Sequence, residues 1–274
     1  MTRTSLISRI VLSLAFLLAV NGVQSAHAQP ETLTVAAANS LKDVLRKVLP
    51  LFEAQHPNVE VRVIYGPSQS LRKQIEQGAP VDVYLPSLFE EIEELEHKGL
   101  VLDGTKRVFA GTSLVVITGT ASPVPASSLN ELRQVPVVRL AVGDPKTSAV
   151  GKVAAEYLKS SKVDLVLKNS PLVYGEHSRA VLELVATGEA ELGVVYRTDA
   201  APNKHVRILA TTPEESHTPI RYGIAAVWTA KNPSAAADLT EFLVSSDVQP
   251  QLAKLGFDPA GTTIARKGEP EVRR

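Results

Sequence analysis

The chain has 274 residues, with 29 basic and 29 acidic side chains, no cysteine and 44% hydrophobic residues. This near-neutral charge argues against nucleic acid as a partner, and the lack of cysteine excludes a fold that depends on disulfide bonds. A chain of this length can bury a large core, and two lobes fit it better than one.

The first 28 residues have the pattern of an export signal. Arg3 and Arg9 give a positive start, residues 10–20 are apolar, and Ala26-His27-Ala28 fits a cleavage site. The apolar run is too short for a membrane span, and no stop-transfer pattern follows it. We expect residues 1–28 to be removed on export to the periplasm. Of the 274 residues 246 then remain, with 27 basic and 29 acidic side chains.

Residues 34–44 run from an apolar strand, through small residues, into an amphipathic helix. Asn39 and Ser40 stand where this helix begins. The first turn of a helix has unpaired N–H groups and a partial positive charge, so a small anion can bind there without a lysine or arginine. The alternative is that Asn39 or Ser40 only caps the helix. The apolar face of the helix has the expected spacing and comprises Leu41, Val44, Leu45, Val48 and Phe52.

The same pattern of strand, small polar turn and helix recurs. Residues 59–65 alternate as a strand, and Gly66-Pro67-Ser68 then opens a helix. Residues 139–142 lead into a turn at 143–148, and a helix follows over residues 149–159. In open α/β sheets, ligands bind where strand ends meet helix starts. We therefore expect these turns to converge on one cleft and to form a cage of N–H and O–H donors.

The remaining pattern divides the chain into two α/β lobes. Strands are expected over residues 81–85, 114–117, 172–174, 192–196 and 222–228, and helices over 88–98, 178–187, 234–244 and 246–255. The Ser/Pro-rich stretch 118–128 and residues 208–217 are the expected crossings between lobes. Lobe I would then comprise 29–118 and 216–265, and lobe II 119–215, with a disordered tail at 266–274. Alternating strands and helices favour a mostly parallel sheet in each lobe, and two crossings favour hinge closure over a cleft.

The sequence has none of the common signatures of catalysis. There is no cysteine, no G-x-S-x-G, no Walker A loop and no metal-ligand spacing, and the histidines are scattered. An enzyme that uses the cleft through an unrecognised site stays open as an alternative. Tyr196 ends an apolar strand, so its hydroxyl could donate to a ligand, or its ring could simply belong to the core.

Five stretches together resemble a known family. They are residues 36–41 (AAANSL), 74–82 (QIEQGAPVD), 140–145 (LAVGDP), 192–196 (LGVVY) with Asp199-Ala200, and 213–217 (PEESH). In this order they resemble the periplasmic molybdate-binding proteins of bacterial ABC transporters. The resemblance implies a two-lobed periplasmic-binding-protein fold of type II. It also implies that the protein captures a tetrahedral oxyanion, molybdate or tungstate, and delivers it to a membrane permease. Such a protein would be a monomer without a cofactor and would not be an enzyme.

The resemblance also implies the binding residues. Ser40 and Ser68 would donate through hydroxyl and backbone N–H groups, Val150 and Ser178 through backbone N–H groups, and Tyr196 through its hydroxyl. Molybdenum would be held only as molybdate. The sequence departs from the family at Val150, and at Ser178, where relatives often have an aliphatic residue, which puts the selectivity of the pocket in question. A receptor for sulfate or another oxyanion is the alternative.

One carboxylate lies close to the expected site. Asp144 is in the turn at 143–148. We expect it to point away from the cleft and to accept backbone N–H bonds within its own turn.

Overall fold

The structure, a computed structural model, describes residues 30–122, 139–160 and 165–260. The expected signal at 1–28, the expected tail at 266–274 and residues 123–128 of the Ser/Pro-rich stretch lie outside these ranges. No helix in the described ranges is long and apolar enough to cross a membrane.

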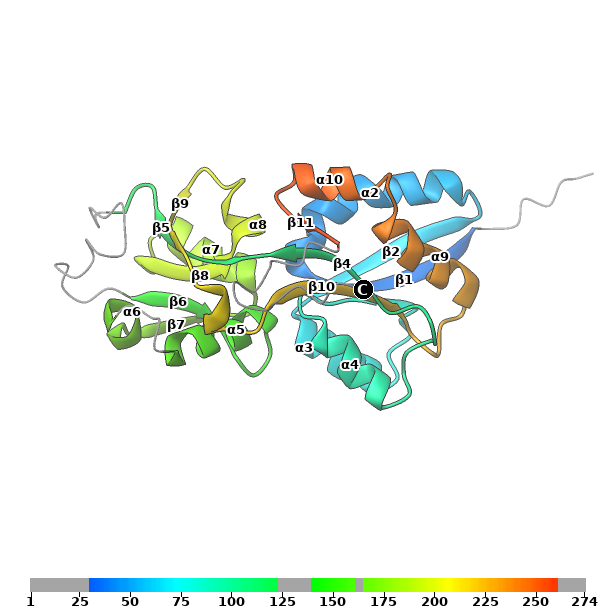
Figure 1. Ribbon diagram of the computed structural model, residues 1–274, viewed down its shortest axis with the longest axis horizontal. Coiled ribbons are helices and arrows are strands. Elements are labelled where there is room, and N and C mark those ends of the chain that lie inside the picture. Colours follow the sequence, from blue (N-terminus) through cyan, green and yellow to red (C-terminus); the bar gives the residue numbers. More distant parts are fainter. Residues whose placement is uncertain (1–29, 123–138, 161–164, 261–274) are drawn as a thin grey trace, which may run out of the picture. The chain divides into compact units, whose positions relative to one another are not determined.

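Lobe I is built on a six-stranded sheet with the strand order β11-β4-β10-β3-β1-β2 (Figure 1). β1 pairs in parallel with β2 and β3, whereas β10 pairs antiparallel with β3 and β4, and β4 pairs antiparallel with β11. The sheet is therefore mixed. The strands are β1 (Glu31–Ala38), β2 (Val59–Gly66), β3 (Val83–Leu85), β4 (Arg107–Thr112), β10 (Ile220–Ala226) and β11 (Asp258–Pro259).

Helices cover both faces of this sheet. α2, α9 and α10 bury their apolar sides against one face, while α3 and α4 pack on the other with Leu71, Ile75 and Ile92 (Figure 1). The short 3-10 helix η1 precedes α2, whose expected apolar face is buried throughout. These elements are η1 (Asn39–Leu41), α2 (Lys42–Gln55), α3 (Ser68–Glu76), α4 (Glu90–His97), α9 (Pro233–Val244) and α10 (Gln249–Lys254).

Lobe II is built on a five-stranded sheet with the order β7-β6-β8-β5-β9. β6 pairs in parallel with β7 and β8, and β5 pairs antiparallel with β8 and β9. α5 packs on one face, and α7 buries Val181, Leu182 and Val185 on the other. The strands are β5 (Leu114–Gly119), β6 (Leu140–Gly143), β7 (Leu172–Gly175), β8 (Leu192–Tyr196) and β9 (Val206–Thr211). The helices are α5 (Ala149–Lys159), α6 (Leu165–Asn169), α7 (Ser178–Ala186), α8 (Arg197–Ala200) and the 3-10 helix η3 (Glu214–Ser216).

The two-lobed α/β organisation is confirmed, and three details of the sequence prediction are corrected. Each sheet is mixed rather than mostly parallel, because the strands at both crossings run against their neighbours. Residues 114–118 were expected in lobe I, but β5 belongs to the lobe II sheet, so the chain first crosses at Ser113. The segment read as the return crossing begins as a strand, β9, and the return to lobe I lies between β9 and β10.

Candidate functional site

All five residues predicted from the sequence line one pocket between the two lobes. Its cavity volume is only about 20 Å³, which suits a small ligand. Ser40 and Ser68 come from lobe I, and Val150, Ser178 and Tyr196 come from lobe II. The remaining lining residues are Ala38, Asn39, Gly66, Pro67, Ser87, Ser148, Ala149 and His177.

The starts of four helices meet at this pocket: the three that the sequence pattern predicted to converge, and α7, where the family resemblance placed Ser178. Two of them have side-chain caps: Ser148 Oγ accepts the N–H of Gly151 at 3.3 Å, and His177 Nδ1 accepts the N–H of Ala180 at 3.1 Å. The caps occupy N–H groups at the third helical position and leave those of the first two, including Val150 in α5 and Ser178 in α7, without an intrahelical acceptor.

The interpretation of Asn39 or Ser40 as a simple helix cap is wrong. Ala38 precedes η1, and neither η1 nor α2 has a side-chain cap hydrogen bond. Instead, the Tyr222 hydroxyl donates to Ser40 Oγ at 3.2 Å. Because the serine oxygen accepts this bond, its own proton is left to donate toward the pocket.

Backbone packing fixes the wall formed by α5. A Cβ atom placed on Gly151 would come within 2.5 Å of the carbonyl oxygens of Gly143 and Asp144, and one on Gly143 would lie 2.6 Å from the Gly151 nitrogen. Only glycine allows the end of β6 and the first turn of α5 to approach so closely. The N–H groups of this turn are therefore held against the strand end.

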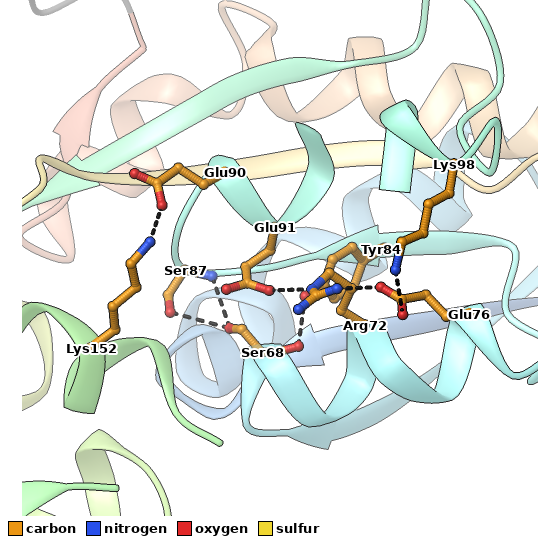
Figure 2. A network of polar contacts seen from close by, with 9 residues as sticks. All are labelled: Ser68, Arg72, Glu76, Tyr84, Ser87, Glu90, Glu91, Lys98 and Lys152. Atoms are coloured by element: carbon orange, nitrogen blue, oxygen red, sulfur yellow. Dashed lines mark hydrogen bonds and ion pairs between the residues drawn. The ribbon is translucent and has the colours of Figure 1, made fainter. Parts of the chain in front are cut away.

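A connected set of hydroxyl groups joins the lobes across the pocket. Ser68 Oγ accepts the N–H of Ser87 at 3.1 Å and lies 3.2 Å from Ser87 Oγ. Ser87 Oγ in turn lies 3.1 Å from the hydroxyl of Tyr196. Tyr84 supports this set, because its hydroxyl donates to the Ser68 carbonyl at 2.7 Å (Figure 2). The strand-end position of Tyr196 thus brings its hydroxyl to the pocket, while its ring is buried.

Ser178 has a second role that the sequence did not indicate. Its Oγ accepts the backbone N–H of Tyr196 at 3.2 Å, so the side chain ties the start of α7 to the end of β8. The Ser178 backbone N–H stands at the first position of α7 and has no intrahelical acceptor; its role as a ligand donor stays a prediction of the family resemblance.

The lining residues include no aspartate, glutamate, lysine or arginine. Burial raises the pKa of the Tyr196 hydroxyl well above its ordinary value, so this group stays a protonated donor. Burial also lowers the pKa of His177, which favours the neutral ring. Since Nδ1 of that ring accepts an N–H, the proton belongs on Nε2. The lining thus offers neutral donors to an anion.

Charged side chains near the pocket are paired with one another. Glu91 is buried and its carboxylate accepts from Arg72 Nε at 2.7 Å; burial raises the pKa of Glu91 although Arg72 opposes this. Arg72 also pairs with Glu76, which Lys98 contacts at 2.8 Å (Figure 2). Because each of these charges is paired with one of opposite sign, their combined electrostatic effect on the hydroxyl groups beside Ser68 is reduced.

Three further charged groups lie outside the pocket lining. Lys152 of α5 pairs with Glu90 of α4 across the lobes (Figure 2). Asp144 is not among the lining residues, and its Oδ1 accepts the N–H of Lys146 at 2.8 Å, which confirms its expected role in the turn. Throughout the described ranges, no group of three or more His, Asp or Glu side chains is arranged to hold a metal ion.

Sequence reasoning missed three polar lining residues: Ser87, Ser148 and His177. Ser148 and His177 each precede an amphipathic helix, so the capping pattern could have identified them. Ser87 follows the short strand β3 and lies before α4, with no local pattern that marks it. It reaches the pocket only because β3 is placed beside β1 in the sheet.

Comparison with known proteins identifies the family. A model of the bacterial extracellular solute-binding proteins matches residues 33–258. The chain is 32% identical over 244 residues to the molybdate-binding protein ModA of Haemophilus influenzae, covering 88% of this chain and 95% of the relative.

Solved structures agree on the fold. The periplasmic molybdate-binding protein of Azotobacter vinelandii aligns with a TM-score of 0.71 and 19% identity, covering 82% of this chain and 98% of that chain. The sulfate-binding protein SubI of Mycobacterium tuberculosis aligns with a TM-score of 0.72 and 21% identity, covering 85% and 88%. The family consists of extracytoplasmic proteins that bind solutes for ABC transporters and are not enzymes. This chain, with its two lobes and a small pocket between them, belongs to the bacterial extracellular solute-binding protein family.

Proposed function

We propose that this protein captures a tetrahedral oxyanion, molybdate and also tungstate, in the pocket between its lobes. Ser40 and Ser68 donate through hydroxyl and backbone N–H groups, Tyr196 donates through its hydroxyl, and Val150 and Ser178 donate through backbone N–H groups. Molybdenum is bound only in the form of molybdate.

The observation that carries this proposal is the convergence of helix starts and hydroxyl groups on a pocket lined by no lysine, arginine, aspartate or glutamate. Helix starts and hydroxyl donors attract a small anion. A fully deprotonated oxyanion accepts at every oxygen, which matches a lining made of donors. The molybdate-binding relatives named above support the choice of ligand.

The expected strength of binding suits a scavenger. A hydrogen bond to a charged group contributes roughly 1.5–3 kcal/mol. Five to seven such bonds, less the cost of closing the lobes and immobilising the ion, leave on the order of 8–12 kcal/mol. This corresponds to a dissociation constant between about micromolar and nanomolar.

The proposal includes a cellular setting. The protein is exported to the periplasm through residues 1–28, works as a monomer without a cofactor or nucleic acid, and passes its ligand to an ABC permease. The family to which the chain belongs supports the extracytoplasmic setting and the transporter.

A sulfate receptor is the second candidate. Sulfate is also tetrahedral and fully deprotonated at neutral pH, and the fold aligns well with that of a sulfate-binding protein. Sulfate is the smaller ion, so the size of the closed pocket decides between the two ligands.

Calorimetric titration of the mature chain with molybdate, tungstate, sulfate and phosphate tests the proposal. We expect molybdate and tungstate to bind at micromolar concentration or below, with sulfate at least about tenfold weaker. Tighter binding of sulfate would establish the second candidate, and a lack of heat with all four ions would refute oxyanion capture.

A further inference from the structure

Arg179 joins the two lobes beside the pocket and takes no part in lining it. It is the second residue of α7 in lobe II. Its Nη2 lies 2.7 Å from Asp43 Oδ2, in the first turn of α2 in lobe I, and its Nε lies 3.2 Å from Asp199 Oδ1, in α8. One guanidinium group thus binds a carboxylate of each lobe.

The two carboxylates differ in their surroundings. The Asp199 side chain is 1% exposed, and its second oxygen has no hydrogen-bond partner. Asp43 is 61% exposed, and its pKa is lowered chiefly by the hydrogen bond from Arg179. Asp199 and Arg179 lie in the same lobe, so their contact survives when the lobes separate, whereas the contact with Asp43 forms only when the lobes meet.

Each member of this bridge follows a pocket residue closely in the sequence. Arg179 comes directly after Ser178, while Asp43 and Asp199 come three positions after Ser40 and Tyr196. The bridge therefore fixes the backbone that carries donors from both lobes. Because the Arg179 guanidinium is paired with both Asp43 and Asp199, its positive charge is compensated by these carboxylates and does not bind the ligand directly.

We propose that Arg179 is a positioning residue for lobe closure, oriented by Asp199 and engaging Asp43 only in the closed state. This inference rests on the proposed function, because closure over an oxyanion is what the bridge favours. It predicts that the Arg179–Asp43 pair contributes to ligand affinity although neither residue touches the ligand.

A double-mutant cycle on the dissociation constant for molybdate tests this pairing. The variants are Asp43→Asn, Arg179→Gln and the double variant, each measured by calorimetry. Each substitution alone also changes the electrostatic potential at the anion, and these two effects on the dissociation constant simply multiply in the double variant. A departure of the double variant from that product is the coupling, and it reports the direct Arg179–Asp43 interaction. We expect a coupling of about two- to fivefold, as is typical of a partly exposed ion pair. Asp199 is left unchanged, because its removal would leave a cation without its fixed partner.

The pair Arg139–Glu191 provides the matched control. Arg139 Nη2 lies 2.7 Å from Glu191 Oε1, and both residues belong to lobe II. The cycle with Arg139→Gln and Glu191→Gln should show no coupling in the dissociation constant. Coupling of equal size in both cycles, or no coupling for Asp43 and Arg179, overturns the inference.

A second measurement needs no ligand. The chain has no native cysteine, so Lys47→Cys on α2 and Glu183→Cys on α7, both exposed, can carry a unique pair of spin labels. In ligand-free protein, Arg179→Gln should shift the interlabel distances toward longer values, while Arg139→Gln leaves them unchanged. Identical distances in the Arg179→Gln variant also overturn the inference. If wild-type protein bound none of the four oxyanions, the proposed function would fail, and the distances would still decide the role of Arg179.

Discussion

Ser87 Oγ lies 3.1 Å from the hydroxyl of Tyr196, although the two residues belong to different lobes. The same Ser87 oxygen lies 3.2 Å from Ser68 Oγ, so three hydroxyl groups form one connected wall of the pocket. These hydroxyl groups can turn their O–H bonds toward a bound anion by rotation alone and donate hydrogen bonds to it. The wall is therefore organised before the ligand arrives. Substitution of its members should therefore reduce ligand affinity.

Removal of the Tyr196 hydroxyl should weaken molybdate binding by about 1–3 kcal/mol, because it deletes a donor to a charge. The variant is Tyr196→Phe, measured by calorimetry. Tyr174→Phe is the control, since Tyr174 lies on β7 of the same lobe with its side chain 57% exposed. Equal affinities of the Tyr196→Phe variant and wild type would show that this hydroxyl does not donate to the ligand.

Ser68→Ala should weaken molybdate binding by a similar amount, about 1–3 kcal/mol. The substitution removes a ligand donor and also the acceptor of the Ser87 N–H. Ser70→Ala in the same helix is the matched control, because Ser70 does not line the pocket. A loss of the same size in both variants would indicate damage to α3 rather than loss of a donor.

Ser178→Ala should reduce affinity less than Ser68→Ala does, because the ligand donor at Ser178 is the backbone N–H. It should instead lower the thermal stability, since the buried N–H of Tyr196 loses its acceptor, at a cost of about 1–3 kcal/mol. Calorimetry and thermal unfolding measure the two effects separately. If this variant loses more affinity than Ser68→Ala, the assignment of the backbone donor is wrong.

Phosphate should compete poorly with molybdate. Near neutral pH phosphate retains a proton that needs an acceptor, and a lining of donors leaves that O–H unpaired at a cost of about 1–3 kcal/mol or more. Asp144, the carboxylate that could have accepted it, is engaged with the N–H of Lys146. Competition calorimetry tests this expectation, and displacement of molybdate at comparable phosphate concentration would contradict it.

The free energy of unfolding should fall as the pH drops below about 6.5, in part because of His177. Burial lowers the pKa of His177 in the folded protein, so the unfolded chain takes up a proton before the folded protein does. The contribution of His177 is therefore present above the unfolded pKa and is lost on acidification. His177→Asn keeps a good helix cap, and its unfolding free energy should depend less on pH between about 5 and 7. Parallel pH profiles in urea for both proteins would contradict this role.

Local sequence patterns predicted the residues that depend on local structure. The turns at 66–68 and 143–148 were found because a strand, a polar turn and an amphipathic helix follow one another within a few residues, and the backbone of a helix start always has unpaired N–H groups. The choice of Ser68 and Val150 as donors in these turns came from the family resemblance. The limits of α5 and β8 agree with their predicted ranges for the same reason. All five predicted residues line one pocket, while their role in binding stays a prediction.

Features that depend on distant pairing were not predictable in this way. The apolar run of β5 would suit either sheet, and nothing in it states that its neighbours are β8 and β9 rather than β10. Ser87 reaches the pocket through the pairing of β3 with β1. The contact of Arg179 with Asp43 joins residues 136 positions apart. Such contacts arise from the packing of whole elements, which single-sequence periodicity does not record.

The position of β10 within the lobe I sheet has a consequence for folding. This strand lies between β3 and β4, so the sheet has a gap at its middle until residues 220–226 have been synthesised. Lobe II, by contrast, uses a continuous stretch from β5 to β9 and can form from more local contacts. Since long-range pairing is slow, lobe I should complete its structure last. β10, which is synthesised after every strand of lobe II, thus decides when Ser40 and Ser68 first acquire a rigid support.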